Sequence, residues 1–469
     1  METFRQNTAY KVPHAAARHR SHHGGVSAEE DRTECQIMND SNACSEALEA
    51  LQRETFNYFV HEANPLNGLV IDKTKPGSPA SIAAVGLALS SYPVAVERGF
   101  TSRADAVKRT LTALRFFHQS VQSTDVDATG YKGFYYHFLD MTTGKRVWKC
   151  ELSTVDSTFL LAGMLTASAY FSENTSDERE IRELADMLYR RADWNWAQNG
   201  GLAVTLGWTP ESGFLPYRWQ GYDEALFLYV LGLGSPTHPL PKESYLQWTS
   251  TYKWREIYGR EFLYSGPLFT HQISHLWIDF REIQDDYMRS KNIDYFENSR
   301  RATYVQQEYA IRNPAHFDGY GAKCWGITAS DGPGPAKSTI KGREREFFGY
   351  KARGVPDGPD DGSIAPWAVI ASLPFAPEIV LPTLAYFEKL KLREKNPYGF
   401  KATFNTTFAE RADVSHPWIS PFHYGLNQGP IVLMIENYRC GFLWHLTRQC
   451  PYVVAGLRQS GFRGGWLEK

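Results

Sequence analysis

The sequence predicts an all-α fold, an (α/α)6 toroid in which paired helices form a ring and long loops form a cleft on one face. Roughly a dozen segments carry apolar residues at helical spacing. Short connections between these segments alternate with very long ones that are rich in Gly, Pro, Tyr and Trp. This alternation indicates paired helices, with the long loops gathered on one face.

The helical segments can be placed in order along the chain. The first carries Leu48 and Phe59 on one apolar face, and Ser78 and Pro79 supply an N-cap and a first-turn proline for the second. Further helices are expected near residues 103–121, 154–172, 178–193, 222–232, 243–258, 271–290, 292–311, 364–388 (broken at Pro374 and Pro377), 430–447 and 451–460. The long loops are expected at residues 122–153, 195–221, 312–363 and 395–429.

The composition is that of a chain with a large buried core. Hydrophobic residues make up 42% of the 469 positions and aromatic residues 14%, which suffices for one large core. Residues 1–42 differ, because they are polar and rich in His and Arg. They predict a mobile N-terminal arm ahead of a single domain at residues 43–469.

The net charge and the hydropathy of the sequence indicate which partners and which location to expect. The formal net charge is only −2, from 50 basic and 52 acidic residues, so neither a nucleic acid nor a membrane surface is expected as a partner. The first 40 residues contain no apolar stretch of signal-peptide length and none that could span a bilayer. A cytoplasmic location is the default expectation, with export left open, and nothing indicates the oligomeric state.

Several classes of protein are disfavoured because their motifs are missing. The six cysteines form no CxxC pair and no zinc-finger spacing, so buried thiols are expected. The pairs Cys35/Cys44 and Cys440/Cys450 could form disulfides only if the protein were exported. No GxGxxG, GxxxxGK[ST] or GxSxG motif occurs, which disfavours nucleotide binding and acyl transfer.

Two stretches have the composition of a carbohydrate site. Residues 208–241 combine aromatic rings, glycines and prolines with the acidic pair Asp223 and Glu224, just ahead of an apolar helix. Aromatic rings can stack on sugar faces, while Gly and Pro hold a loop that presents side chains. Residues 266–287 have a similar composition. A carbohydrate-active enzyme is therefore the leading hypothesis.

A resemblance to a known family covers the chain from about Leu48 to its C-terminus. It rests on motifs in order, which are ELSTVDSTFLLAG (151–163), YDEALFLYVLGLGSPTHP (222–239), LFTHQISHLWIDFR (268–281), DYFENSRRAT (294–303), WGITASDGP (325–333), DGSIAPWAVIASLPFAPE (361–378), YGFKATFN (398–405) and NQGPIVLMIENYR (427–439). This series resembles the glucoamylase-like domain of glycoside hydrolase family 144 and its relatives.

The resemblance implies an (α/α)6 fold and hydrolysis of β-1,2-glucan. Family members commonly act within the chain, invert the anomeric carbon and release sophorose or short β-1,2-gluco-oligosaccharides. No metal or organic cofactor is implied. The alternatives are a non-catalytic glycan-binding toroid, a related domain with transglycosylating or exo activity, and a helical-toroid metalloenzyme.

Glu224 is the candidate general acid. Inverting hydrolysis needs one carboxylic acid to protonate the leaving oxygen and one carboxylate to activate water. Glu224 matches the family's glutamate in the Tyr-x-x-Glu-like turn, and its aromatic neighbours Trp219 and Tyr222 should raise its proton affinity. The alternative is that Glu224 or Asp223 only complements the dipole of the following helix.

The general base has no single candidate. The family's YGF motif usually continues with an acid that could serve on the base side, but Lys401 occupies this region here and the expected carboxylate is missing. A neighbour, Glu410 or Asp413, could take the role.

A second possibility lies in the loop before residue 157. Water could be relayed from another acid such as Asp156 or Glu151, or the arrangement could differ; Glu151 is also a candidate for substrate contact. However, Ser153 and Asp156 also form a capping pattern at a helix start, which needs no catalytic role.

The segment carrying His271, His275, Asp279 and Glu282 places polar groups at spacings of four and three, which a helix would bring together. They could form a sugar-binding wall. They could instead hold a metal ion, although Gln272 stands where a metalloprotease would have its general base. The third interpretation is an internal polar network with Arg281.

Aromatic residues in the loops could stack on glucose rings; these are Trp148, Trp208, Trp219, Tyr222, Trp277, Tyr320, Trp325 and Trp418. Those beside glycines, namely Trp219, Tyr320 and Trp325, are the better candidates for substrate contact. Asp331 and Gln428 are candidate partners for sugar hydroxyls. A turn role for Asp331 and Asp361, and a loop-holding role for Gln428, are the structural alternatives.

Overall fold

The computed structural model describes residues 28–408 and 417–468, with side chains described from Ser45 onward. Contacts between residues divide the chain into two units, Met1–Ala47 and Leu48–Lys469. The predicted N-terminal arm, residues 1–42, lies mostly outside the described residues and stays a prediction. No helix in the described part of the chain is both long and apolar enough to cross a bilayer.

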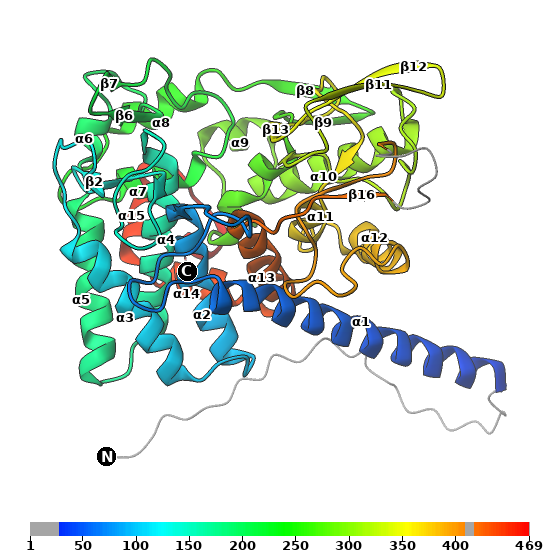
Figure 1. The fold of residues 1–469 in the computed structure, drawn as a ribbon, viewed down its shortest axis with the longest axis horizontal. Coiled ribbons are helices and arrows are strands. Elements are labelled where there is room, and N and C mark those ends of the chain that lie inside the picture. Colours follow the sequence, from blue (N-terminus) through cyan, green and yellow to red (C-terminus); the bar gives the residue numbers. More distant parts are fainter. Residues whose placement is uncertain (1–27, 409–416, 469) are drawn as a thin grey trace. The chain divides into compact units, whose positions relative to one another are not determined.

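Helices dominate the second unit, as the apolar periodicity predicts (Figure 1). The α-helices are α1 (Ala28–His61), α2 (Ile82–Glu97), α3 (Arg103–Gln119), α4 (Thr154–Tyr170), α5 (Ser176–Arg191), α6 (Trp194–Ala197), α7 (Leu226–Leu233), α8 (Lys242–Thr249), α9 (Asp286–Lys291), α10 (Tyr295–Arg312), α11 (Pro366–Ala371), α12 (Pro377–Lys389), α13 (Gly425–Cys440), α14 (Phe442–Arg448) and α15 (Pro451–Gln459). The 3-10 helices are η1 (Leu268–His271), η2 (Ile273–Leu276) and η3 (Gly465–Leu467).

The core centres on α2, α4 and α13, whose side chains are buried around most of the helix. α2 packs against both α4 and α13, while α3 and α5 pack on each other and on α2 and α4. Glycines allow α2 and α4 to touch. A Cβ at Gly86 would lie 2.1 Å from the carbonyl oxygen of Phe159, and one at Gly163 would lie 2.1 Å from that of Gly86. Only a residue without a side chain fits such a backbone contact.

Short strands lie in the loops, which the all-α prediction omitted. They are β1 (Ala80–Ser81), β2 (Gly130–Tyr131), β3 (Phe134–Tyr136), β4 (Phe138–Leu139), β5 (Leu152–Ser153), β6 (Gly207–Thr209), β7 (Gly213–Phe214), β8 (Trp254–Ile257), β9 (Arg260–Leu263), β10 (Ala329–Ser330), β11 (Ala336–Ile340), β12 (Arg343–Phe347), β13 (Lys351–Ala352), β14 (Ser363–Ile364), β15 (Phe404–Asn405) and β16 (Trp418–Ile419). Long loops folded over a core must pair their backbone groups, and short strands do so.

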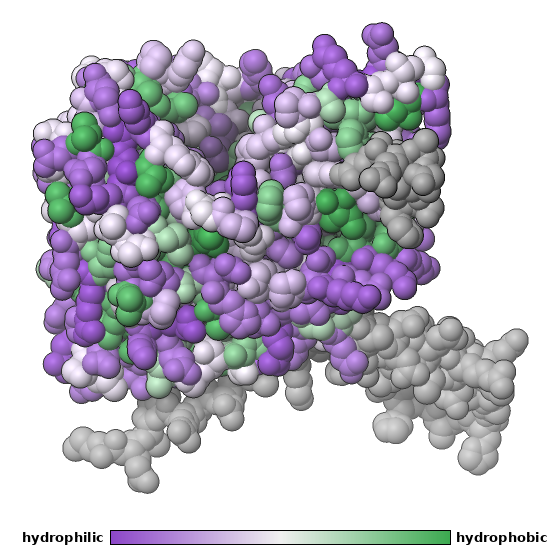
Figure 2. Space-filling model, viewed as in Figure 1, coloured by the Kyte–Doolittle hydropathy of each residue, from purple (hydrophilic) through white to green (hydrophobic). Residues whose placement is uncertain are grey.

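Two of the small sheets join segments that are far apart in the chain. One has five strands in the order β2-β3-β5-β6-β7, and its strand β5 leads directly into α4. The other has three strands in the order β14-β15-β16. Hydrophilic side chains predominate on the face viewed in Figure 2, where apolar ones occur in separate small groups.

Four expectations about helices are wrong. Residues 430–447 form parts of two helices, α13 and α14, because Gly441 between them has a left-handed backbone that ends α13. Residues 271–290 do not form one helix, because η1, η2 and an irregular stretch precede α9. Asp279 accepts a hydrogen bond from the backbone N–H of Arg281, and Asp285 caps α9, so side chains here compete with helical backbone bonding. Residues 243–258 split into α8 and strand β8. Helix α2 is capped by Ser81 rather than Ser78, since residues 80–81 pair as β1 with β4.

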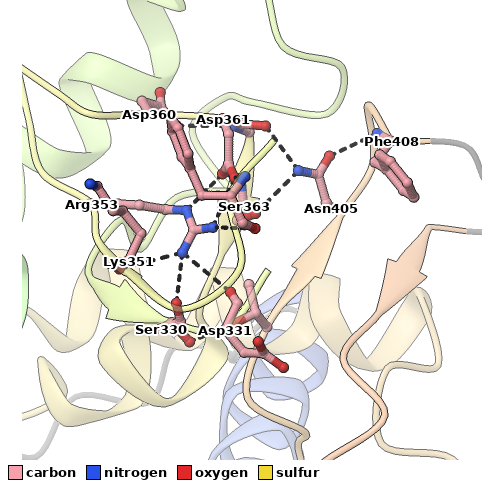
Figure 3. Close-up of polar contacts among 12 residues, drawn as sticks. Ser330, Asp331, Lys351, Arg353, Asp360, Asp361, Ser363, Asn405 and Phe408 are labelled. Atoms are coloured by element: carbon pink, nitrogen blue, oxygen red, sulfur yellow. Dashed lines mark hydrogen bonds and ion pairs between the residues drawn. The ribbon is translucent and has the colours of Figure 1, made fainter. Parts of the chain in front are cut away.

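A buried ion pair holds the loop between β10 and β14 (Figure 3). Arg353 and Asp361 are both fully buried, and the guanidinium donates to the two carboxylate oxygens at 2.7 and 2.8 Å. Arg353 also donates to the carbonyl oxygens of Ser330 at 2.7 Å and Gly349 at 3.1 Å. Asn405 on β15 donates to the carbonyl oxygen of Asp361 at 2.9 Å. One cation therefore ties together several separate segments of backbone.

We expect Asp361→Asn to lower the free energy of unfolding by about 3–5 kcal/mol, because it leaves the Arg353 charge buried without a counter-charge. Urea unfolding would measure the loss. The control is Glu346→Gln, which removes an exposed partner 3.9 Å from Lys337 and should change stability by at most about 0.5 kcal/mol. Equal, small effects of the two variants would contradict the role given to the buried pair.

Candidate active site

A cavity of ≈ 400 Å³ collects residues from the long loops and from the N-terminal ends of helices. This volume lies within the range of about 300–1,000 Å³ that is typical of ligand pockets. Three acidic residues line it, namely Asp72, Asp156 and Glu224. The cavity thus brings together two acids that the sequence indicated and one that it did not.

Glu224 lies in the turn before α7 and is half-buried. Burial raises the pKa of its carboxyl to about 8, and the negative charges of Asp156 and Asp223 add to this, while His137 opposes it. A carboxyl group with this pKa holds its proton at neutral pH. Glu224 can therefore donate a proton, which is what a general acid must do.

Asp156 lies in the first turn of α4, with its side chain largely buried. Ser153 caps the helix by accepting a hydrogen bond from the backbone N–H of Asp156 at 3.2 Å. Its hydroxyl donates in turn to Asp156 Oδ2 at 2.5 Å. The predicted cap is confirmed, yet Asp156 also faces the cavity that Glu224 lines. The capping role and a catalytic role therefore do not exclude each other.

His137 lines the same cavity and was missed at the sequence level. Its Nδ1 lies 2.9 Å from Glu151 Oε1, and its Nε2 lies 3.7 Å from Asp156 Oδ1. Burial disfavours its charge, but Asp156, Glu151 and Asp72 outweigh burial and raise the pKa of His137 to about 9. The cation in turn holds the pKa of Glu151 below its usual value, although burial opposes this.

The side chain of His137 is fixed on two sides. The imidazole stacks on the ring of Phe138, with ring centres 4.0 Å apart and planes 11° from parallel.

The sequence offered only a weak signal for His137, because this residue lies in an aromatic run within a long loop. Its partners Glu151 and Asp156 are 14 and 19 positions later in the chain, so only the fold brings them together.

Asp72 is the one acid lining this cavity that sequence analysis missed. Burial raises the pKa of its carboxyl, with a contribution from Asp156, whereas Lys73 and His137 lower it. Its backbone carbonyl accepts a hydrogen bond from Gly425 at the start of α13 at 2.8 Å. Asp72 therefore faces Asp156 from a loop anchored to a different helix.

The two histidines of the predicted polar wall do not line this cavity. Both are buried, and burial lowers the pKa of His271 to about 4 and that of His275 to about 3. His275 Nε2 lies 3.0 Å from Ser299 Oγ, and Asp279 pairs with Arg281 at 2.7 Å and with Arg448. These contacts favour the internal polar network among the three interpretations.

Four aromatic residues that were predicted to contact substrate have partners within the protein. Trp219 donates from Nε1 to Thr154 Oγ1 at 3.0 Å, beside the N-terminus of α4. Tyr222 packs edge-on against His271, with ring centres 5.1 Å apart. Tyr320 donates to Asp360 at 2.7 Å, and Trp325 is fully buried and donates to Thr383 at 2.9 Å. None of these four rings lines the cavity described here.

The remaining candidates are polar residues. Asp331 accepts a hydrogen bond from Ser420 at 2.8 Å, and it contributes to raising the pKa of Tyr424, a residue of the cavity wall. Gln428 is fully buried, and its amide lies 3.5 Å from the carbonyl oxygen of Phe400. Asp413, like Glu410, lies outside the described residues.

No group of three His, Cys, Asp or Glu side chains suited to a metal ion occurs among the described residues. The cavity contains carboxyl groups whose environments differ. A protonated acid, a second carboxyl and aromatic walls within a helix-rich scaffold are typical of glycoside hydrolases.

Comparison with known proteins agrees with this class. Residues 216–451 match the family model described as "Putative glucoamylase". A putative glucoamylase from Bacteroides uniformis has 33% sequence identity and a TM-score of 0.80, with 90% of this chain and 98% of that chain covered. The chain belongs to this glucoamylase-like family, which confirms the resemblance to glycoside hydrolase family 144.

Relatives with named substrates act on β-1,2-glucans. The structure of an endo-β-1,2-glucanase from Chitinophaga pinensis, with sophorotriose and glucose, has 27% identity and a TM-score of 0.79, covering 90% of this chain and 99% of that chain. An exo β-1,2-glucooligosaccharide sophorohydrolase (non-reducing end) from Parabacteroides distasonis is 29% identical over 448 residues, or 88% of this chain. This chain spans only 57% of the length of that relative.

The pKa of Glu224 predicts a basic limb in the pH dependence of kcat/KM near pH 8, because a general acid is inactive once it has lost its proton. His137→Gln should move this limb to higher pH. The cation favours the carboxylate of Glu224, so its removal favours the protonated acid. A shift toward lower pH, or none, would contradict the electrostatic coupling. The control is His238→Gln, which changes an exposed histidine 4.0 Å from Asp193.

Proposed function

We propose that this protein hydrolyses β-1,2-linked glucan or its oligosaccharides, with inversion at the anomeric carbon and Glu224 as general acid. The observation that carries the proposal is the proton-holding carboxyl of Glu224 in a cavity that also contains Asp156. The substrate class is supported by the relatives that act on β-1,2-glucans. In the same proposal, the helices of residues 43–469 form an (α/α)6 toroid that is the catalytic domain.

Asp156 is the proposed base that activates water. Its Oδ2 accepts a hydrogen bond from the hydroxyl of Ser153, and its Oδ1 lies near the His137 cation, so both oxygens have fixed neighbours. Inversion requires the water to attack from the side of the sugar opposite to the leaving oxygen. Asp156 and Glu224 come from different elements of the fold, the start of α4 and the turn before α7, which suits two separate roles.

Endo action is the proposed mode. This mode is supported by the structural similarity to the endo-β-1,2-glucanase of Chitinophaga pinensis, at a TM-score of 0.79. The rival proposal, exo release of a disaccharide, is distinguished by product size. A non-catalytic glycan-binding protein is less well supported, because it has no need for a carboxyl group held protonated at neutral pH.

We expect Glu224→Gln to keep the fold and the affinity for glycan but to lower turnover of β-1,2-glucan about a hundredfold or more. Reducing-sugar release and calorimetric binding would measure the two effects separately. Glu243→Gln is the matched control, because Glu243 is exposed in the first turn of α8 and does not line the cavity. Near-normal turnover by the Glu224→Gln variant would exclude Glu224 as the acid.

Endo action predicts that long β-1,2-glucan loses chain length early in the reaction, before small products accumulate. Size-exclusion chromatography over a time course would reveal this fall. If disaccharide accumulated while the polymer kept its size, the exo mode would be correct. A protein that left β-1,2-glucan intact, while cleaving another glucan, would overturn the proposed substrate.

A further inference from the structure

Trp148 differs from every other tryptophan of the chain in its exposure. All 13 tryptophans lie in the described part of the sequence, and Trp148 alone is exposed, at 64% of its surface. It also lines the cavity that contains Glu224 and Asp156. A large aromatic ring left open to solvent at a ligand cavity is typical of a surface that a partner covers.

The backbone at this position is strained. Trp148 and Lys149 have φ values of 56° and 50°, in the left-handed region that residues with bulky side chains rarely adopt. Such a conformation persists only where surrounding contacts impose it, most often at ligand clamps and active sites. Glycine would adopt this conformation more easily, so packing alone gives no reason for a tryptophan here.

The surrounding contacts do impose the turn. Arg146, whose side chain is buried, donates to the carbonyl oxygen of Cys150 at 2.6 Å and pairs with Glu211 at 2.8 Å. The thiol of Cys150 accepts the backbone N–H of Phe138 at 3.3 Å, and Val147 donates to the carbonyl oxygen of Phe138 at 3.2 Å. Both ends of the turn are thereby attached to the strand that carries Phe138.

A continuous row of rings leads from Trp148 to the carboxyl groups. The centre of a Trp148 ring lies 5.2 Å from that of Phe138, and Phe138 stacks on His137 at 4.0 Å. The far nitrogen of His137 lies 3.7 Å from Asp156. Trp148 is therefore at the rim of the cavity, separated from the reacting groups by two rings.

We propose that Trp148 is a specificity-determining residue, a platform that binds a glucosyl residue at a distance from the bond that is cleaved. This inference rests on the proposed function and extends it. A sugar bound on Trp148 lies beyond the residues next to the scissile bond, so its contact is available only to longer oligosaccharides. Trp148 thus makes affinity depend on chain length.

Trp148→Gly is the sharpest test, because glycine removes the ring and tolerates the left-handed backbone. We expect KM for long β-1,2-gluco-oligosaccharides to rise roughly three- to tenfold, the size expected of one aromatic contact. KM for the shortest cleaved oligosaccharide and kcat should change little, and the melting temperature should be unchanged or higher. A residue that only supported the fold would instead lower the melting temperature without a length-dependent KM.

Two further variants complete the experiment. Trp148→Phe should recover most of the affinity, because it restores an aromatic face. Tyr217→Ala, at a ring that is 71% exposed but outside the cavity, should leave KM unchanged at every length. If the wild-type protein cleaved β-1,2-glucan and Trp148→Gly left all KM values unchanged, the inference alone would fail. If the wild-type protein cleaved no β-1,2-glucan, the proposed function and this inference would fail together.

Discussion

The buried pair of Arg353 and Asp361 is the interaction on which the wall of the cavity depends. Ala329, Tyr350 and Ala352 line the cavity from the backbone that this pair ties together. A buried ion pair gives little net stability, because both charges lose their water. Its contribution is to fix the positions of backbone segments. The five guanidinium N–H groups point in fixed directions, so the acceptor oxygens must lie along those directions. The loop can thus carry exposed rings such as Tyr350 with only the two-residue strands β10 and β13 paired beside it.

The chemistry of the cavity depends on a balance of charge. Glu224 is protonated because it is buried and because Asp156 lies nearby. Asp156 has His137 as a counter-charge, and Glu151 shares the same cation. If His137 were absent, the negative charges of Asp72, Glu151 and Asp156 would repel one another in a partly dry space. The His137 cation therefore favours the charged forms of Glu151 and Asp72, whereas burial and the negative charge of Asp156 raise the pKa of Glu224 against the effect of His137.

Local sequence patterns predicted most helices and two of the acids that line the cavity. They did not predict site residues whose partners lie far away in the chain. The predicted helix positions agree for α3, α4, α5 and α15, because apolar periodicity and capping are local properties. Asp156 and Glu224 could be found because each lies at a helix start within a family motif. His137 and Asp72 could not, since nothing near them in the chain reveals their partners. The spacing of His271 and His275 predicted that both lie on one face of an α-helix. The segment instead forms two 3-10 helices, η1 and η2, so this prediction was wrong.

The strained turn at Trp148 shows how a loop of this fold is held in place by side chains. Helices hold the first turn of α4 and the turn before α7 with little freedom, so the carboxyl groups proposed as catalytic can stay fixed while the loops vary. A loop gains comparable rigidity only through side chains that bond its backbone, as Arg146 and Cys150 do around Trp148 and Arg353 does around Tyr350. Rigidity of this kind lets a loop hold an exposed ring in an unfavourable conformation. Substrate recognition can therefore be built on loops without disturbing the charge balance on the helices beneath them.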